Sequence, residues 1–156
     1  MIDLTKNRYD FDDLAEIMRT LRSPEGCPWD REQSLETLRA FCIEEADEVC
    51  TAIDRVLADG GDDDWAELCE ELGDLLLQVV FQARIAEEEG MFTLNDVVNA
   101  IVKKLIRRHP HVFGDTRADT SDDVLANWKV IKQAEKSAKA MGEELSAEKA
   151  EGLLGK

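Results

Sequence analysis

Two long amphipathic segments joined by an acidic, glycine-containing turn constrain this chain most. Between Ser34 and Glu89, apolar residues recur at three- and four-residue spacing, and the turn Asp59-Gly60-Gly61-Asp62 divides the stretch in two. Residues at this spacing share one face of an α-helix, so the pattern is typical of helices that bury one side. The sequence therefore predicts a pair of long helices. Since no segment elsewhere has a strand pattern, the expected fold class is all-α.

Each of these helices carries one apolar stripe. On the first helix the stripe consists of Leu38, Cys42, Val49, Ile53 and Val56. On the second helix it consists of Leu68, Leu72, Leu75, Val79 and Ala83. Further apolar residues of the second helix lie off its stripe, at Leu76, Val80, Phe81 and Ile85. A helix that is apolar on more than one side needs more cover than one small helical unit provides, which predicts a homodimer.

Carboxylates lie among or beside these stripes. Glu45 falls inside the first stripe and Glu48 lies at its edge, while Glu71 and Asp74 follow one border of the second. An ExxE pair can thus face an ExxD pair. Converging carboxylates take up protons unless a cation keeps them ionised. Oxygen ligands suit a hard ion, so the four predict a site for Mg²⁺, with Mn²⁺ as a substitute. The alternative is that they simply face water.

The charge balance limits the partners of this chain. Its 156 residues suit one domain and carry a net charge of −16, which repels phosphates and argues against a general nucleic-acid or membrane-surface binder. No apolar run is long enough to cross a bilayer, and the N-terminal residues do not form a signal peptide. None of the four cysteines belongs to a CxxC pair, which favours reduced thiols and a cytoplasmic location.

Three further helices are expected, giving about five in total. Asp10 can cap a helix over 11–21, Thr93 can cap one over 93–109, and Thr120 or Ser121 begins the last. The stretches between them, 23–34 and 109–120, contain prolines and glycines and are predicted to be loops. The tryptophan in the first of these loops, Trp29, either packs against the helices or forms the rim of a binding site.

The fourth helix ends in the densest basic cluster of the chain. Its predicted buried face consists of Val97, Val98, Ile101 and Leu105. The cluster that follows consists of Lys103, Lys104, Arg107 and Arg108. These cations either complement the helix dipole or contact a phosphate, and the pattern leaves both interpretations open. On the last helix, Val124, Leu125, Trp128 and Ile131 are expected to point inward.

Four segments, in order, resemble those of the MazG-type nucleoside triphosphate pyrophosphohydrolases. The two acidic motifs lie within EEADE and EELGDLLLQVVF. The segment CPWDREQS precedes them, and KKLIRRHPHVFGD and NWKVIKQAEK follow. The resemblance runs from about Phe11 to Lys136. It implies a MazG-type domain over residues 1–136, and the polar residues 137–156 are expected to form a C-terminal tail or a frayed helix.

The resemblance also implies a reaction and a site. Members of the family hydrolyse a nucleoside triphosphate to the monophosphate and pyrophosphate with Mg²⁺, which clears the nucleotide pool. The implied fold is a helical unit that dimerises into a core like a four-helix bundle. Glu45, Glu48, Glu71 and Asp74 match the catalytic metal ligands of the family. Lys104, Arg108, Trp128 and Lys132 match positions that contact the nucleotide.

Two other functions compete with this hypothesis. Many relatives carry two MazG domains, and the CPWD and RRHPHVFGD segments resemble the first of such a pair. The chain could therefore be a dimerisation domain that binds metal and nucleotide with little turnover. A ferritin-like di-metal bundle is a third hypothesis, but that class uses Glu-x-x-His pairs on two helices, whereas both histidines here, His109 and His111, lie outside the long helices.

Overall fold

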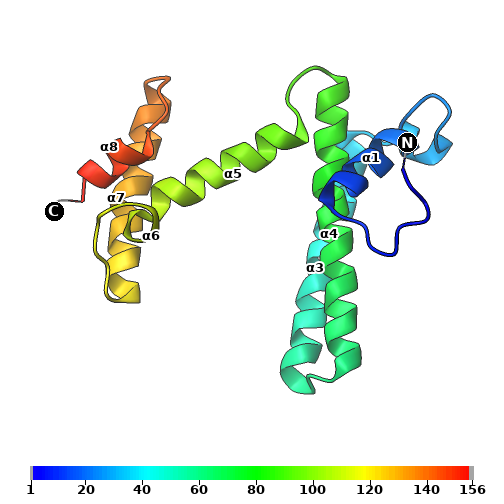
Figure 1. Ribbon diagram of the computed structural model, residues 1–156, viewed down its shortest axis with the longest axis horizontal. Helices are drawn as coiled ribbons and strands as arrows, with labels where there is room; N and C mark the ends of the chain where they lie inside the picture. The colour runs from blue at the N-terminus through cyan, green and yellow to red at the C-terminus, as the bar shows by residue number, and fades with distance from the viewer. Residues whose placement is uncertain (1, 155–156) are drawn as a thin grey trace. The chain divides into compact units, whose positions relative to one another are not determined.

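The computed structural model describes residues 2–154, which contain eight helices and no strand (Figure 1). The helices are α1 (Phe11–Leu21), α2 (Pro28–Glu32), α3 (Leu35–Ala58), α4 (Asp62–Glu88), α5 (Leu94–Arg108), α6 (Pro110–Phe113), α7 (Ser121–Ala140) and α8 (Ala147–Gly152). The predicted all-α class is confirmed. Within the described range, none of these helices has the length and apolar character needed to cross a membrane. The chain divides into unit 1, up to Leu94, and unit 2, from Asn95 onward.

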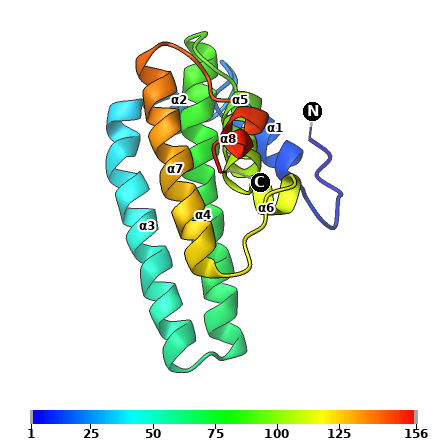
Figure 2. The same ribbon diagram turned by 90° about the vertical axis from the view of Figure 1, so that its left-hand side faces the viewer.

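Helices α3 and α4 form the long hairpin that the sequence predicts. Ser34 caps α3 as expected: its hydroxyl accepts from the Thr37 N–H at 3.3 Å, and the Thr37 hydroxyl accepts from the Ser34 N–H at 3.0 Å. This reciprocal pair satisfies two backbone donors at the helix start. At the turn, Gly60 has φ +64°, a left-handed conformation that favours glycine. The two helices therefore run antiparallel and side by side (Figures 1 and 2).

The core of unit 1 lies between α1, α3 and α4. Met18 of α1 and Leu38 of α3 pack with Val80, Phe81 and Ile85 of α4, and all five are at least 95% buried. The prediction of a dimer treats Val80, Phe81 and Ile85 as uncovered within one chain. This part of the argument is wrong, because all three are buried within the chain. Helix α1 packs across α4 and covers a side that the periodicity of α4 alone leaves open.

Nearer the hairpin turn, residues that were predicted to be buried are exposed. Three members of the predicted stripes, Ile53, Leu72 and Val79, are 40%, 49% and 43% exposed in the chain by itself. Leu76 is also 40% exposed. Figure 1 shows α1 beside the end of α4 that lies farther from the turn, so this part of α4 has only α3 beside it within unit 1. The hairpin therefore presents apolar side chains next to its acidic ones.

The stretch before α3 is not a plain loop, because it contains α2. Pro28 occupies the first turn of this short helix, where its fixed φ suits a helix start. Arg22 fastens the segment by donating to two of its backbone carbonyls and by pairing with Glu88 of α4 at 2.7 Å. Trp29 meets Phe41 edge-on with 6.2 Å between ring centroids, yet it is 55% exposed, so it rests on α3 and does not plug the core.

Unit 2 contains the rest of α5 together with α6, α7 and α8. Its buried residues are Pro110, Ile131, Ala138 and Ala150. Of the two residues proposed to begin the last helix, Thr120 is the N-cap, and its hydroxyl accepts from the Asp123 N–H. The predicted loop over 109–120 contains the short helix α6, which also begins with a proline. Residues 137–154 hold the last turn of α7 and all of α8; 155 and 156 lie outside the described residues.

The C-terminal helix is tied to the turn that follows α6. One oxygen of the Glu151 carboxylate accepts from the N–H of Asp115 at 2.5 Å and from the N–H of Thr116 at 2.9 Å. The Thr116 hydroxyl lies 3.3 Å from the same oxygen. A carboxylate that accepts several donors is a strong, charge-assisted contact, so it stabilises the packing of α8 on α6.

Three of the four residues predicted to form the buried face of α5 are exposed, whereas Val97 is half-buried. Val98, Ile101 and Leu105 are 40%, 45% and 46% exposed. These positions have the spacing of a buried face, but no helix of unit 2 covers them. Their apolar surface is therefore available for a further contact.

Candidate functional site

Three of the four predicted metal ligands converge inside the hairpin. One carboxylate oxygen each from Glu45 of α3 and from Glu71 and Asp74 of α4 lies within 4.8 Å of the other two. Spacing of i and i+3 places Glu71 and Asp74 on one face, and the antiparallel hairpin brings Glu45 opposite them. Two oxygens that share one hard divalent cation lie at most about 4–5 Å apart, so the donor set fits such an ion. We call these residues the carboxylate cluster.

The fourth predicted ligand, Glu48, borders the carboxylate cluster without joining the three. It lies three residues after Glu45 on α3 and therefore on the same face of the helix. Its charge contributes to the raised pKa of both Glu45 and Glu71. Glu48 therefore adds negative charge to the surroundings of the cluster.

The electrostatics of the cluster disfavour its ionised form. Burial raises the pKa of Glu45, and the charges of Asp74 and Glu48 raise it further. Burial also raises the pKa of Glu71, again reinforced by Glu48 and Asp74. A bound cation would lower the pKa of each ligand, because it favours the charged form. The protein therefore holds these carboxylates close together at a cost in free energy that a divalent ion would relieve.

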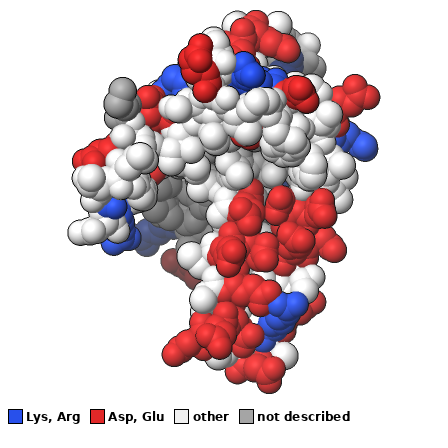
Figure 3. Space-filling model, turned by 90° about the vertical axis from the view of Figure 1, so that its right-hand side faces the viewer, with Lys and Arg blue, Asp and Glu red and all other residues white. Residues whose placement is uncertain are grey.

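Other acidic residues of the hairpin have different surroundings. Asp and Glu side chains gather over the part of the hairpin near its turn (Figure 3). The exposed acidic residues in the sequence on either side of the turn include Asp54, Asp59, Asp62, Asp63 and Glu70. Arg55 lies among them and forms an ion pair with Glu67, which joins α3 to α4. Glu67 therefore has a structural partner, whereas Glu45, Glu71 and Asp74 have no ion-pair partner among the described residues.

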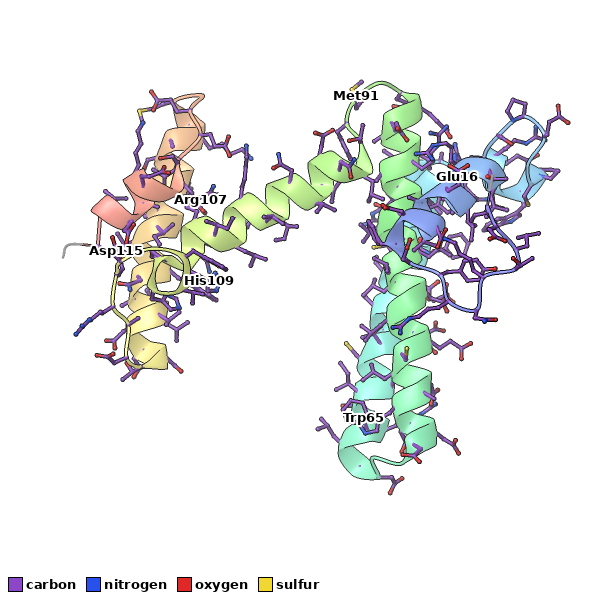
Figure 4. The ribbon with its side chains drawn as sticks, viewed as in Figure 1. Glu16, Trp65, Met91, Arg107, His109 and Asp115 are labelled. Atoms are coloured by element: carbon purple, nitrogen blue, oxygen red, sulfur yellow. The ribbon has the colours of Figure 1, made fainter. Side chains whose placement is uncertain are left out.

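The predicted nucleotide-contacting residues lie in unit 2, at the end of α5 and along α7. Trp128 Nε1 donates to the backbone carbonyl of Arg108 at 2.6 Å. The rings of His109 and Trp128 are nearly perpendicular, with 5.2 Å between centroids, and Lys132 Nζ lies 5.5 Å from the Trp128 ring centroid. Arg107 and His109 appear together at the C-terminal end of α5 in Figure 4. The indole ring is thus held in a fixed orientation by both helices.

Sequence reasoning missed Glu135, which joins the same two helices. Its carboxylate accepts from Arg107 Nε and from Arg108 Nη2, each at 2.7 Å. Burial alone would raise the pKa of Glu135, but hydrogen bonds from Arg108 and Arg107 outweigh burial and lower it. An acid three residues after Lys132 on a lysine-rich helix was the available signal. Arg108, predicted to contact the nucleotide, is therefore already paired.

A groove of about 500 Å³ in unit 2 collects four lysines. Lys104 of α5 and Lys132 of α7, both predicted nucleotide contacts, line it together with Lys136 and Lys139. None of the four forms an ion pair with another residue that the structure describes. Arg107 and three glutamates, Glu135, Glu143 and Glu144, line the same groove, which we call the lysine groove.

The fold and the site together define an all-α protein with a carboxylate cluster that fits a divalent cation. Comparison with known protein families is more specific. The family model of the MazG nucleotide pyrophosphohydrolase domain matches residues 33–113, from just before α3 to the end of α6. The chain belongs to this family. The matched range includes all four acidic residues as well as Lys104 and Arg108.

Individual relatives agree with this assignment. The chain is 51% identical over 130 residues to a protein of Escherichia coli (strain K12) named nucleoside triphosphate pyrophosphohydrolase, covering 83% of this chain and 47% of that protein. It is 50% identical over 129 residues to the Thermotoga maritima protein named nucleoside triphosphate pyrophosphohydrolase/pyrophosphatase MazG, covering 83% and 46%. It is 46% identical to the uncharacterized protein YabN of Bacillus subtilis, covering 83% and 25%. The chain therefore spans about half or less of the length of these relatives.

Proposed function

We propose that this chain hydrolyses nucleoside triphosphates to the monophosphate and pyrophosphate in the presence of Mg²⁺, as a step in clearing the nucleotide pool. The observation that carries the proposal is the convergence of Glu45, Glu71 and Asp74 within 4.8 Å. Support comes from relatives that share about half of their residues with this chain over the aligned region and whose names state this activity.

The four carboxylates Glu45, Glu48, Glu71 and Asp74 would hold the metal. When bound there, Mg²⁺ polarises phosphate oxygens and lowers the pKa of its water, which hydrolysis of a phosphoanhydride requires. The protein contributes a half-buried setting at Glu45 and Glu71, where charges interact more strongly than in bulk water. Mn²⁺ would fit the same oxygen donors.

We propose that residues of unit 2 contact the nucleotide. Lys104 and Lys132, unpaired in their groove, can neutralise the charge of the phosphates. Trp128, with its Nε1 held by the Arg108 carbonyl, offers a flat and immobile face for a base. Stacking of this kind tolerates different bases. Arg108 would have to share its guanidinium between a phosphate and Glu135.

We further propose that two chains assemble as a homodimer whose core resembles a four-helix bundle. The support is the exposed apolar surface of two helices, Leu72, Leu76 and Val79 on α4 and Val98, Ile101 and Leu105 on α5. Large exposed apolar surfaces are uncommon on monomers and often mark contacts with another chain. Light scattering at micromolar concentration should give the mass of two chains, and the mass of one chain would contradict the dimer.

The direct test is an assay of pyrophosphate release from a panel of nucleoside triphosphates, with Mg²⁺ and with excess chelator. We expect release with Mg²⁺, the matching monophosphate as the second product, and no release with chelator. Release of inorganic phosphate and a diphosphate would mean that a different bond is cleaved. Absence of any turnover across the panel would contradict the proposal.

A second candidate is a domain that binds metal and nucleotide and dimerises but turns over little substrate. The observation that favours it is the length of the relatives, since this chain covers only 25–47% of the three described above. Calorimetry separates the two candidates. Nucleotide binding that requires Mg²⁺, combined with no pyrophosphate release, would support the binding domain over the enzyme.

A further inference from the structure

Gln78 is a buried amide whose position packing does not explain. Gln78 is 6% exposed. Among the residues that the structure describes, it is the only polar or charged residue that is buried. It follows Glu71 by seven residues and Asp74 by four on α4, so it shares their face of the helix. A leucine or methionine would fill the same space without burying polar atoms.

Each end of the Gln78 amide has a different environment. Nε2 donates to Glu45 Oε1 over 3.4 Å, from α4 across to α3. Oε1 is fully buried and has no hydrogen-bond partner among the described residues. Both atoms belong to one planar amide, so Oε1 lies within roughly 6 Å of the Glu45 carboxylate. An unpaired buried carbonyl is unfavourable, and its place beside the carboxylate cluster calls for a donor there.

When they are ionised, the side chains of the cluster cannot supply that donor. Ionised carboxylates only accept hydrogen bonds, and Glu45, Glu71 and Asp74 are all acceptors when ionised. A water held among them by a cation has its lone pairs engaged and offers its hydrogens. The amide of Gln78 is thus matched to both kinds of neighbour, with a donor for Glu45 and an acceptor for such a water.

We infer that Gln78 is a positioning residue of the carboxylate cluster: its Nε2 orients Glu45, and its Oε1 accepts a hydrogen bond from a water held at the cluster. The inference rests on the proposed metal-dependent hydrolysis. Gln78 itself neither binds the nucleotide nor ligates the metal. It restricts the rotamers of Glu45 and the orientation of the water.

The test replaces the amide without changing the volume much. Gln78→Met removes both polar atoms and should leave the melting temperature of the metal-free protein unchanged or higher, because an unpaired buried carbonyl is gone. Its affinity for Mn²⁺, measured by calorimetry without nucleotide, should fall by about 10- to 100-fold, as is typical when a partner of a metal ligand is lost. The kcat should fall as well, with little change in the KM of the nucleotide.

The matched control is Gln82→Met, one turn further along the same helix at a half-buried position. It should keep the Mn²⁺ affinity and the kcat of the original protein. Gln78→Leu repeats the test with a different shape in case the methionine variant does not fold. A purely structural role predicts a lower melting temperature without metal and an unchanged Mn²⁺ affinity.

The outcomes separate this inference from the proposed function. If the original protein binds Mn²⁺ and releases pyrophosphate, and folded Gln78→Met and Gln78→Leu bind Mn²⁺ equally well, the inference about Gln78 is overturned and the function stands. If the original protein neither binds a divalent cation nor releases pyrophosphate, both are overturned. A loss of Mn²⁺ affinity at Gln78 but not at Gln82 supports the positioning role.

Discussion

Two half-buried glutamates, one in each unit, show how differently the two regions treat charge. Burial acts to raise the pKa of both Glu45 and Glu135. Around Glu45 the neighbouring charges are Asp74 and Glu48, so its pKa rises. Around Glu135 they are Arg108 and Arg107, so its pKa falls. The negative charge around Glu45 is therefore uncompensated among the described residues and is compatible with a bound cation, whereas Glu135 is compensated by two arginines of its own unit.

The two regions are also built differently. Unit 1 positions its carboxylates on a long hairpin with an apolar core between α1, α3 and α4. Unit 2 positions its cations through polar contacts between α5 and α7, chiefly the Arg107–Glu135 pair and the Trp128 bond to the Arg108 carbonyl. We therefore expect mutations of the carboxylates to abolish turnover. Mutations of the polar contacts in unit 2 should instead change the free energy of unfolding.

The largest effect is expected for Asp74→Asn. It keeps the size of the side chain but removes a charged ligand, so turnover should fall below detection and Mg²⁺ should no longer raise the melting temperature to the same extent. Pyrophosphate release and thermal melts with and without Mg²⁺ measure both. Asp63→Asn, at an exposed position in the first turn of α4, is the control and should behave normally. Full activity of Asp74→Asn would remove the carboxylate cluster from the mechanism.

A smaller effect is expected for Lys104→Ala. Loss of one charge-assisted phosphate contact costs roughly 2–4 kcal/mol in transition-state stabilisation, or about 30- to 1,000-fold in rate. The Mg²⁺-dependent rise in melting temperature should persist, because the carboxylates are intact. Lys103→Ala removes a neighbouring cation that lies 3.8 Å from Glu144 and should have little effect. Equal rates for Lys104→Ala and the original protein would exclude the lysine groove from phosphate binding.

Glu135→Gln should act on the stability of unit 2. It leaves Arg107 and Arg108 without their shared carboxylate, and hydrogen bonds to charged groups are worth about 1.5–3 kcal/mol. Denaturant unfolding followed by the fluorescence of Trp128 should show a loss of this order, after Trp29 and Trp65 are replaced by phenylalanine. Glu144→Gln, at a carboxylate 68% exposed, should cost about 0.5 kcal/mol or less. Similar stability of the two variants would show that the paired arginines contribute little.

The smallest effect concerns pH, and its sign differs between the two units. Glu45 and Glu71 have a raised pKa when folded, so without metal their contribution to the free energy of unfolding falls as pH rises from the ordinary glutamate pKa through the folded values. Glu135 has a lowered pKa, so its contribution is present above the ordinary value and is lost as pH falls through the folded one. Melting curves should be measured across pH, with chelator and with saturating Mg²⁺. They should show that the ion removes the pH dependence that arises from Glu45 and Glu71. An identical pH dependence in both conditions would contradict the metal site.

Much of unit 1 could be predicted because its signals are local. Asp10 and Ser34 cap the helices expected of them, since capping depends on a few neighbouring residues. The meeting of Glu45 with Glu71 and Asp74 followed from helical spacing and one turn. The prediction failed where the burial of a residue depends on an element that is distant in the sequence. Periodicity along α4 could not show that α1 covers Phe81 or that Leu72 stays exposed.

The polar contacts of unit 2 were harder to foresee. Glu135 meets Arg107 and Arg108 from residues 27 and 28 positions away, and no spacing rule links a residue of one helix to a particular residue of another. The short helices α2 and α6 were missed because proline was counted only as a helix breaker. In both helices the proline stands in the first turn, where its missing N–H costs nothing. Glu151, which ties α8 to the turn after α6, lies in a stretch expected to be a tail or frayed helix.

The left-handed Gly60 in the hairpin turn has a consequence for how this chain can vary in length. Each residue added to a helix turns everything beyond it by about 100°, so a single insertion between the turn and Glu71 would rotate both Glu71 and Asp74 away from Glu45. Two full turns, about seven residues, restore the direction of a side chain, but only an equal extension of α3 keeps the carboxylates level. We therefore expect insertions in this hairpin to occur as matched pairs of about seven residues, one in each helix, with the glycine turn carried outward unchanged.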